Sequence, residues 1–202
     1  MTTVRSPSMR PNPFATRHTR PGRVMPRDGT GRPLDVASLA SRIRAPDAAA
    51  IEGPHGAGKS NLLAAIAGRL ADAGALADTV RARARHDGSV VATAIVRARP
   101  GTILCVDGWE SLGAVRAAVL RWMARRRGVG LIVTTHRPAG MPTLARCTTT
   151  AALLGRIVAD LPDHGGLVTN ADVEHAYAAH GGNLREALYD LYDRFERRAR
   201  RC

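Results

Sequence analysis

One stretch decides the fold: Gly53-Pro54-His55-Gly56-Ala57-Gly58-Lys59-Ser60. It fills the pattern Gly-x-x-x-x-Gly-Lys-Ser, in which a glycine-rich turn joins a strand to a helix and wraps backbone N–H groups around phosphate oxygens. The required context is present, because a small apolar run at 48–52 precedes the turn and a helical pattern at 59–73 follows it. Apolar residues recur every fourth position of that helix, at Leu62, Ile66 and Leu70. The stretch therefore predicts a loop that binds nucleotide phosphates.

The chain holds a single lysine, Lys59, among its 30 basic residues. Arg and Lys differ in shape and hydration, so one lysine kept in an arginine-based chain marks a position where Arg does not fit. In this pattern the lysine reaches the β- and γ-phosphates, and the hydroxyl of Ser60 ligates Mg²⁺. We predict ATP and Mg²⁺ as cofactors, with nucleotide contacts from every residue between Gly53 and Asn61. The chain lacks the Asn-Lys-x-Asp motif that reads guanine, which favours ATP over GTP.

Two apolar strands farther along the chain end in polar residues. The run 102–107 is the clearest strand pattern, and 130–135 is another. Asp107 stands at the end of the first, where a Walker B aspartate would help to hold Mg²⁺. The alternative for Asp107 is a turn residue before Gly108. We predict Ser60 and Asp107 as the metal ligands.

Further polar positions near these strand ends are candidates for catalysis. Glu110 would polarise the attacking water, unless it only stabilises the N-terminus of a helix. Thr135 and His136, with Thr134 before them, are expected beside the γ-phosphate, where they would bind phosphate or orient water. The alternative is an ordinary polar strand end, and the sequence does not separate Thr135 from His136.

Helical and strand patterns alternate through the middle of the chain. Further helices are expected over 34–44, 90–98 and 112–127, and the segment 79–85 fits either an edge strand or an exposed helix. The 112–127 helix is expected to bury Leu112, Val115, Val119 and Met123. This alternation predicts a three-layer α/β/α fold, with a central parallel sheet and helices on both of its faces.

The C-terminal third has a different character. Helices are expected over 151–159 and 171–180, and a third after Asn183, with an apolar stripe at Leu184, Leu188, Leu191 and Phe195. These predict a small helical subdomain. We expect three parts: an arm over 1–33, a nucleotide-binding α/β domain over 34–150, and the helical subdomain with a basic tail over 151–202.

The amino-acid composition indicates which partners the protein can bind and in which compartment it lies. Residues 1–33 hold seven Arg and six Pro but no Leu or Ile, which predicts an extended or disordered arm. The net charge of +13 favours a nucleic acid or an acidic protein as partner of the Arg-rich arm and tail, unless it only reflects coding bias. No long apolar run or signal sequence is evident, so no membrane association is expected. Three scattered cysteines fit a reducing cytoplasm.

Taken together, the glycine-rich loop, Asp107 with Glu110, and the polar strand end at Thr135-His136 resemble the additional-strand P-loop ATPases. That group includes AAA+, STAND and ABC-type ATPases, and Asp107-Gly108-Trp109-Glu110 is similar to a STAND motif. The segment 180–188 resembles the sensor 2 segment of AAA+ lids, which implies a lid from which Arg185 reaches the γ-phosphate. Arg146 falls where AAA+ proteins carry an arginine finger, which implies a role across the interface of a homo-oligomer.

Three functions compete at this stage. The first is an AAA+-like ATPase that acts as a nucleotide-dependent switch or assembly factor. The second is a regulatory module that binds ATP without hydrolysing it. The third is a nucleoside monophosphate kinase, because 51–60 resembles the P-loop of thymidylate kinases. The kinase hypothesis is weakened because the middle of the chain has no Asp-Arg-aromatic motif to bind the acceptor nucleotide.

Overall fold

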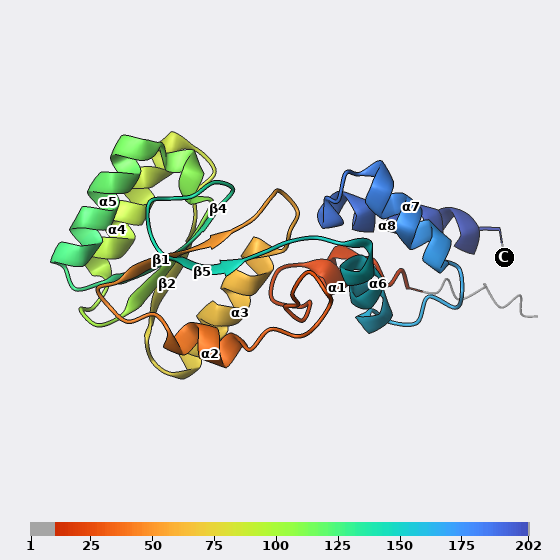
Figure 1. Cartoon of the computed structure of the whole chain (residues 1–202), viewed down its shortest axis with the longest axis horizontal. Coiled ribbons are helices and arrows are strands. Elements are labelled where there is room, and N and C mark those ends of the chain that lie inside the picture. Colours follow the sequence, from red (N-terminus) through yellow and green to blue (C-terminus); the bar gives the residue numbers. More distant parts are fainter. Residues whose placement is uncertain (1–10, 202) are drawn as a thin grey trace, which may run out of the picture.

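The computed structural model describes residues 11–201, and its centre is a five-stranded sheet whose strands all run parallel (Figure 1). The strands are β1 (Ala48–Glu52), β2 (Leu76–Arg81), β3 (Ile103–Asp107), β4 (Gly130–Thr135) and β5 (Thr143–Arg146). Their order across the sheet is β2-β3-β4-β1-β5, so β4 lies between β1 and β3. Because parallel strands end at one edge, the loop after β1 and the polar residues that end β3 and β4 share that edge.

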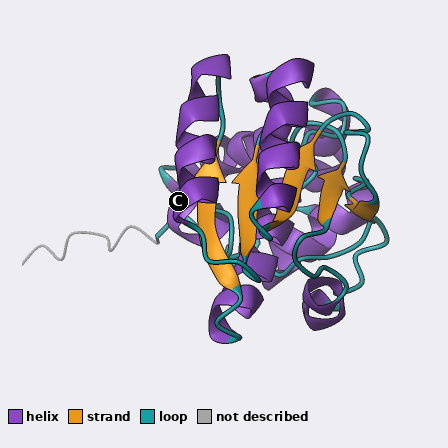
Figure 2. Cartoon of the chain, turned by 90° about the vertical axis from the view of Figure 1, so that its left-hand side faces the viewer, coloured by secondary structure: helices purple, strands orange, loops and turns teal. Residues whose placement is uncertain are grey.

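Helices cover both faces of the sheet (Figure 2). One face carries α2 (Val36–Ser41) and α3 (Lys59–Asp72), and the other carries α4 (Gly88–Arg97) and α5 (Ala114–Arg126). Neighbouring residues of one strand belong to opposite cores: Ile51 packs with Leu62, while Ala50 packs in the cluster of Leu120. The predicted three-layer α/β fold with a central parallel sheet is confirmed.

A helical subdomain with its own apolar core follows the sheet, built from α6 (Ala151–Asp160), α7 (Asn170–Ala179) and α8 (Leu184–Ala199). Figure 1 places it at the end of the molecule opposite α4 and α5. The core includes Leu154, Leu191 and Phe195, all fully buried. A side-chain oxygen caps the N-terminus of each helix, from Thr150, Thr169 and Asn183.

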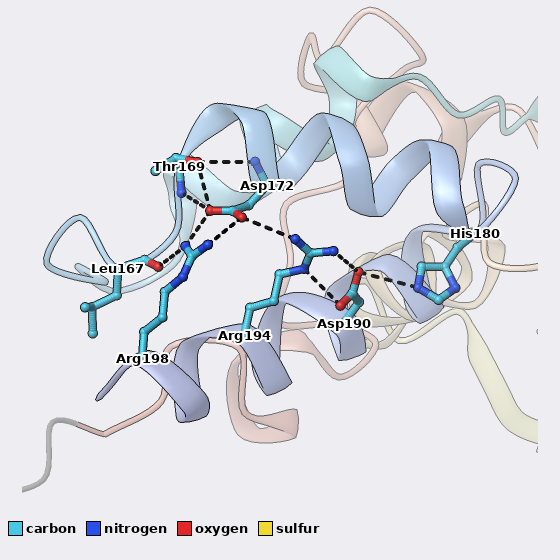
Figure 3. Close-up of polar contacts among 7 residues, drawn as sticks. All are labelled: Leu167, Thr169, Asp172, His180, Asp190, Arg194 and Arg198. Atoms are coloured by element: carbon cyan, nitrogen blue, oxygen red, sulfur yellow. Dashed lines mark hydrogen bonds and ion pairs between the residues drawn. The ribbon is translucent and has the colours of Figure 1, made fainter. Parts of the chain in front are cut away.

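Ion pairs and hydrogen bonds between charged side chains connect α8 to α7 (Figure 3). Arg198 Nη1 donates to Asp172 Oδ2 at 2.6 Å, and Arg194 Nη1 donates to Asp172 Oδ1 at 3.3 Å. Arg194 also pairs with Asp190 on its own helix at 3.0 Å. Asp172 is buried, and its hydrogen bonds from Arg198 and Thr169 hold the pKa of its carboxyl well below the usual range.

The segment before α2 is folded, and α1 (Thr16–Thr19) forms part of it. Phe14 is 2% exposed and packs in the core of the helical subdomain, with its ring centroid 6.4 Å from that of Phe195. Asn12 Nδ2 donates to the Tyr192 carbonyl at 3.1 Å. The expectation of an extended or disordered arm is therefore wrong for residues 11–33, because helices distant in sequence supply the core that the segment itself lacks. Residues 1–10 lie outside the described residues.

The two outer strands differ from expectation. The segment 79–85, which fitted a strand or a helix, belongs in part to the edge strand β2, and this strand begins earlier, at Leu76. Strand β5 was not predicted, because its four residues carry little apolar character and alternate Thr, Leu, Ala and Arg. It pairs with β1 at the opposite edge of the sheet.

The predicted inward face of α5 is also wrong in part. Val115 and Val119 are exposed, whereas Leu120 and Ala124 are buried. The reason is that Leu112 does not belong to this helix. It lies in a separate 3₁₀ turn, η2 (Trp109–Leu112), and Gly113, with φ 77°, separates that turn from α5, so the buried face of α5 is rotated from the predicted one. Within the described residues, no helix is both long and apolar enough to cross a membrane.

Candidate functional site: a glycine-rich loop facing a helical subdomain

A cavity of about 630 Å³ lies where the ends of β3 and β4 and the loop after β1 face the helical subdomain. Residues of the segment 16–27 complete its wall. Six of the lining side chains are cationic and two are carboxylates: Arg20, Arg27, Lys59, Arg81, Arg83 and Arg185 against Asp107 and Glu110. This balance suits an anionic ligand.

Two glycines give the loop 53–60 its shape. Gly56 and Gly58 have φ of 71° and 84°, in the left-handed region that side chains rarely adopt. A Cβ at Gly56 would also collide with Asn183 of the helical subdomain. Gly58 is the N-cap of α3, a helix of 14 residues whose positive dipole end points into the loop.

The ammonium of Lys59 lies within this loop. Its Nζ donates to the carbonyls of Gly53 and Pro54, each at 2.7 Å, and lies 2.9 Å from Nδ1 of His136. Burial lowers the pKa of Lys59, while the nearby carboxylate of Glu110 acts in the opposite direction. The lysine is thus positioned to exchange backbone carbonyls for phosphate oxygens.

Asp107 joins the loop to the neighbouring strands. Its Oδ1 accepts hydrogen bonds from Ser60 Oγ at 2.8 Å and from Thr134 Oγ1 at 2.7 Å. The backbone N–H of Gly108 in turn donates to Thr134 Oγ1 at 2.8 Å. The side chain of Thr134 therefore fixes both the carboxylate and the chain that follows it.

The oxygens of Ser60 and Asp107 fit Mg²⁺, which takes hard oxygen ligands and is usually held by one or two protein groups with phosphates and water. No group of three or more His, Cys, Asp or Glu side chains among the described residues is placed to hold a metal ion. A cation here would therefore depend on ligand oxygens as well.

Glu110 and His136 form the second polar group of the cavity. His136 Nε2 lies 2.8 Å from Glu110 Oε1, so a neutral ring donates from Nε2 to the carboxylate and accepts from Lys59 at Nδ1. Burial and the charge of Lys59 lower the pKa of His136, although Glu110 acts in the opposite direction. The ring also stacks on His55 of the loop, with centroids 3.5 Å apart.

Two predicted site residues have other roles in the structure. Thr135 is buried and its hydroxyl donates to the Arg137 carbonyl at 2.8 Å, so it does not line the cavity. Alternate residues of β4 face opposite sides, and Thr134 and His136 take the cavity side. The side chain of Asn61 reaches the cavity wall, but its amide binds the backbone of Gly22 and Val24, both at 2.8 Å. Thr135 therefore lies outside the cavity lining and Asn61 lies within it, and the expected contacts of both with a nucleotide stay predictions.

The two candidate arginines differ in placement. Arg185, in the first turn of α8, lines the cavity, and its charge acts on Lys59. Arg146 lies on the edge strand β5, where Nη2 is 3.3 Å from Glu52 Oε2. Its side chain is largely exposed and lies outside the cavity lining.

Several lining residues could not be found by sequence reasoning. Arg81 and Arg83 line the cavity at the end of β2, and Arg81 Nε lies 3.5 Å from Asp107 Oδ2. Val24 and Met25 come from the segment before α2. These residues match no motif; the parallel sheet brings the arginines to the site, and the packing of Phe14 and the hydrogen bonds of Asn61 bring Val24 and Met25.

Comparisons with known proteins place the chain in no family. No protein-family model matches it, and no curated protein matches it. Among solved structures, a match is PCH-2 of C. elegans, with 12% sequence identity and a TM-score of 0.39 over 81% of this chain and 67% of that chain.

Proposed function

We propose that the chain binds ATP with Mg²⁺ in this cavity and hydrolyses it, as a nucleotide-dependent switch or assembly factor of AAA+-like type. One observation carries the proposal: Ser60, at the start of α3, and Asp107, at the end of β3, bring their oxygens to 2.8 Å beside Lys59. A loop, a cation and two Mg²⁺-type ligands thus converge at one point.

The order of the strands supports the same assignment. The strand that leads into the loop and the strand that ends in Asp107 are separated by β4. The sheet thus has one further strand between these two, which is compatible with the resemblance of the motifs to the additional-strand ATPases. The polar end of the inserted strand, with Thr134 and His136, then reaches the site from between the other two.

In this proposal the triphosphate lies on residues 53–60, and the base and ribose lie toward the helical subdomain. The lining from the segment before α2 and from the helical subdomain includes the apolar side chains of Val24, Met25, Ile157 and Leu188, and Tyr189 of α8. Apolar and aromatic side chains suit a purine, which is flat and weakly hydrated. Asn183, in contact with the loop at Gly56, ties α8 to the phosphate end.

Other side chains of the cavity would bind the phosphates, activate the water or support the groups that do so. Lys59 binds the β- and γ-phosphates, Glu110 orients the attacking water and accepts its proton, and Arg185 reaches the γ-phosphate from α8. Bound Mg²⁺ would neutralise charge on the phosphate oxygens. Thr134 holds Asp107 in place, and His136 holds Glu110.

A second candidate is a module that binds ATP without hydrolysing it. It is favoured by one contact: Glu110 is paired with His136 at 2.8 Å, and His136 is in turn bound to Lys59. A carboxylate held in this way is not free to activate water unless the pair opens. Both candidates share the nucleotide site and differ only in turnover.

The test compares binding with turnover in the same variants. Lys59→Ala should weaken binding of a fluorescent ATP analogue and abolish phosphate release. Glu110→Gln should keep the binding and lower kcat by roughly a hundredfold. Glu174→Gln, on the exposed side of α7, is the matched control and should change neither. Tight binding with no phosphate release in the wild type would favour the second candidate, and no binding would reject both.

We also propose a partner for the arginine-rich arm and tail. A nucleic acid or an acidic protein would bind the exposed arginines of the arm and tail, and a second copy would be needed for Arg146 to act in trans. Arg27 and Arg198 contribute less to such a surface, because they already pair with Asp160 and Asp172 at 2.7 and 2.6 Å. Binding of DNA or RNA should weaken steeply with salt.

A further inference from the structure

Three large apolar side chains form a row on the outside of α5: Val115, Val119 and Trp122, which are 81%, 54% and 63% exposed. We call them the α5 row. Single exposed apolar residues are common on protein surfaces and need no explanation. The α5 row differs because its members are spaced by four and three residues, and so lie one above another on a single helix face over about 10 Å.

The fold explains why the row faces outward. The opposite face of α5 carries Leu120 and Ala124, which are buried against the sheet. In Figure 1, α5 lies on the outer side of the sheet, at the end of the molecule away from the helical subdomain. The core of this domain is thus complete without the α5 row.

The surroundings of the row are strongly positive. The helix contains four arginines, at 116, 121, 125 and 126, and no acidic residue. Arg126 lies over the ring of Trp122, with Cζ 5.8 Å from its centroid. Arg116 donates to the carbonyl of Arg85, and Arg121 donates to that of Gly140 at 2.6 Å. These bonds to neutral carbonyls hold the two arginines in place and leave their charge uncompensated.

We infer that the α5 row is a docking surface for an acidic amphipathic helix of a partner protein. A row at this spacing is a ridge of the kind that packs into the groove of another helix. The carboxylates of an acidic partner would meet the arginines on both sides of the ridge, as charge-assisted hydrogen bonds. The proposal does not depend on the nucleotide site.

Other occupants fit this surface less well. A bilayer takes up a broad apolar face, whereas here Arg125 and Arg126 share the exposed side with the row. Nucleic acid would use the arginines and the indole but not the two valines. A second copy of a chain with net charge +13 would be repelled, and residues 1–10 carry two arginines and no acidic side chain.

The test uses a synthetic peptide that forms an amphipathic helix of Leu and Glu, labelled for fluorescence anisotropy. We expect saturable binding to the full chain that weakens with salt, and a blue shift of Trp emission. Trp109 is buried, so the exposed Trp122 should supply that shift. Trp122→Phe should abolish it.

Two variants and two matched controls locate the site. Val119→Ser and Arg126→Glu should each weaken the peptide roughly tenfold, which corresponds to about 1.4 kcal/mol. Val90→Ser on α4 changes a valine of similar exposure, 53%, and Arg69→Glu changes an arginine in the last turn of α3. Both controls should bind as the wild type does, and circular dichroism should show all four variants folded.

Several outcomes would overturn the inference. One is equal binding of a Leu and Lys helix, since charge would then play no part. Another is binding to phosphatidylserine vesicles or to oligo-dT, but not to the acidic peptide. A third is self-association in sedimentation that Val119→Ser abolishes, since the occupant would then be a second copy. Absence of peptide binding would reject the proposal outright.

Discussion

Thr134 and Thr135 are neighbours in β4, yet their hydroxyls do different things. That of Thr134 bridges Asp107 and the N–H of Gly108, whereas that of Thr135 binds the Arg137 carbonyl. We predict that Thr134→Val lowers kcat for the proposed ATP hydrolysis roughly ten- to a hundredfold, because the group that orients the proposed metal ligand Asp107 is lost. Nucleotide affinity should change much less. The measurement is steady-state phosphate release, with analogue binding alongside.

Thr135→Val is the matched control for that prediction. It removes the same atom from the adjacent residue, at equal burial, and should leave kcat close to the wild-type value. If the two variants lose activity equally, the loss comes from disturbing β4 and not from the support of Asp107. Thermal unfolding of both variants distinguishes a damaged fold from a damaged site.

His136 gives the site a dependence on pH. Its pKa lies below the ordinary value of 6.5 because burial and Lys59 disfavour the charged ring. The unfolded chain therefore takes up a proton at a higher pH than the folded one. The stability that neutral His136 provides is complete above pH 6.5 and is lost as pH falls through that value toward the folded pKa. His136→Asn should flatten this part of the profile.

The measurement for His136 is the free energy of unfolding by urea across about pH 5 to 8, where histidine titrates. His175→Asn, on the exposed side of α7, is the matched control and should leave the profile unchanged. A wild-type profile that matches the His136→Asn profile would show that the ring does not titrate differently in the folded chain.

At the residue scale, the sequence predicted what a fixed spacing specifies. The motif specifies the order of the loop 53–60 with Lys59 and Ser60, and Asp107 was expected from the end of an apolar strand. The structure brings Asp107 to Ser60 at the start of α3, and their roles toward nucleotide and metal stay predictions. The choice between Thr135 and His136, which the sequence left open, depends on which of them faces the cavity at the end of β4, and no motif encodes that. The partners of Asn61 come from Gly22 and Val24, whose approach depends on tertiary packing.

At the scale of elements, α7 and α8 are joined by one buried carboxylate. Asp172 accepts from Arg194 and Arg198 and also from Thr169 at the start of α7. Asp172→Asn should cost about 3 kcal/mol of stability, because Arg198 loses its carboxylate partner, Arg194 keeps only Asp190, and the helix cap weakens. Asp193→Asn, exposed on α8, removes the same charge and should cost little.

The same carboxylate predicts the response to acid. Since the folded pKa of Asp172 is depressed below 3.8, its contribution is present above that pH and is lost as pH falls further. Chemical denaturation of the wild type and Asp172→Asn at neutral and acidic pH measures this. The stability difference between the two should shrink in acid, and a constant difference would contradict the assignment.

Elements with a strong apolar signal were predictable, and marginal elements were not. Strands β1, β3 and β4 and helix α3 agree closely with their predicted positions, because each strand is a buried apolar run and the helix carries apolar residues at every fourth position. Strand β5 is short and half exposed, so pairing with β1 determines it. The phase of α5 depends on one glycine, Gly113, whose φ of 77° separates η2 from the helix.

At the scale of the whole molecule, the segment 11–33 links the two folded parts. Its beginning packs in the helical subdomain through Phe14 and Asn12, and its middle is bound to α3 through Asn61. Between these attachments it forms one wall of the cavity. A composition rich in Arg and Pro gave no sign of this, because the apolar partners of Phe14 belong to helices at the other end of the chain.

Phe14→Ala should therefore release the segment. The lost aromatic side chain should cost about 3–5 kcal/mol, as is usual for a fully buried Phe, and the cost should fall on the helical subdomain. Trypsin should cut faster after Arg17 and Arg23, which are exposed but held in a folded segment. Nucleotide affinity should fall as well, because Val24 and Met25 leave the cavity wall. Met25→Ala, whose side chain is 54% exposed, is the control and should leave cleavage unchanged. Wild-type cleavage rates in Phe14→Ala would mean that the contacts of Asn61 hold the segment without the aromatic anchor.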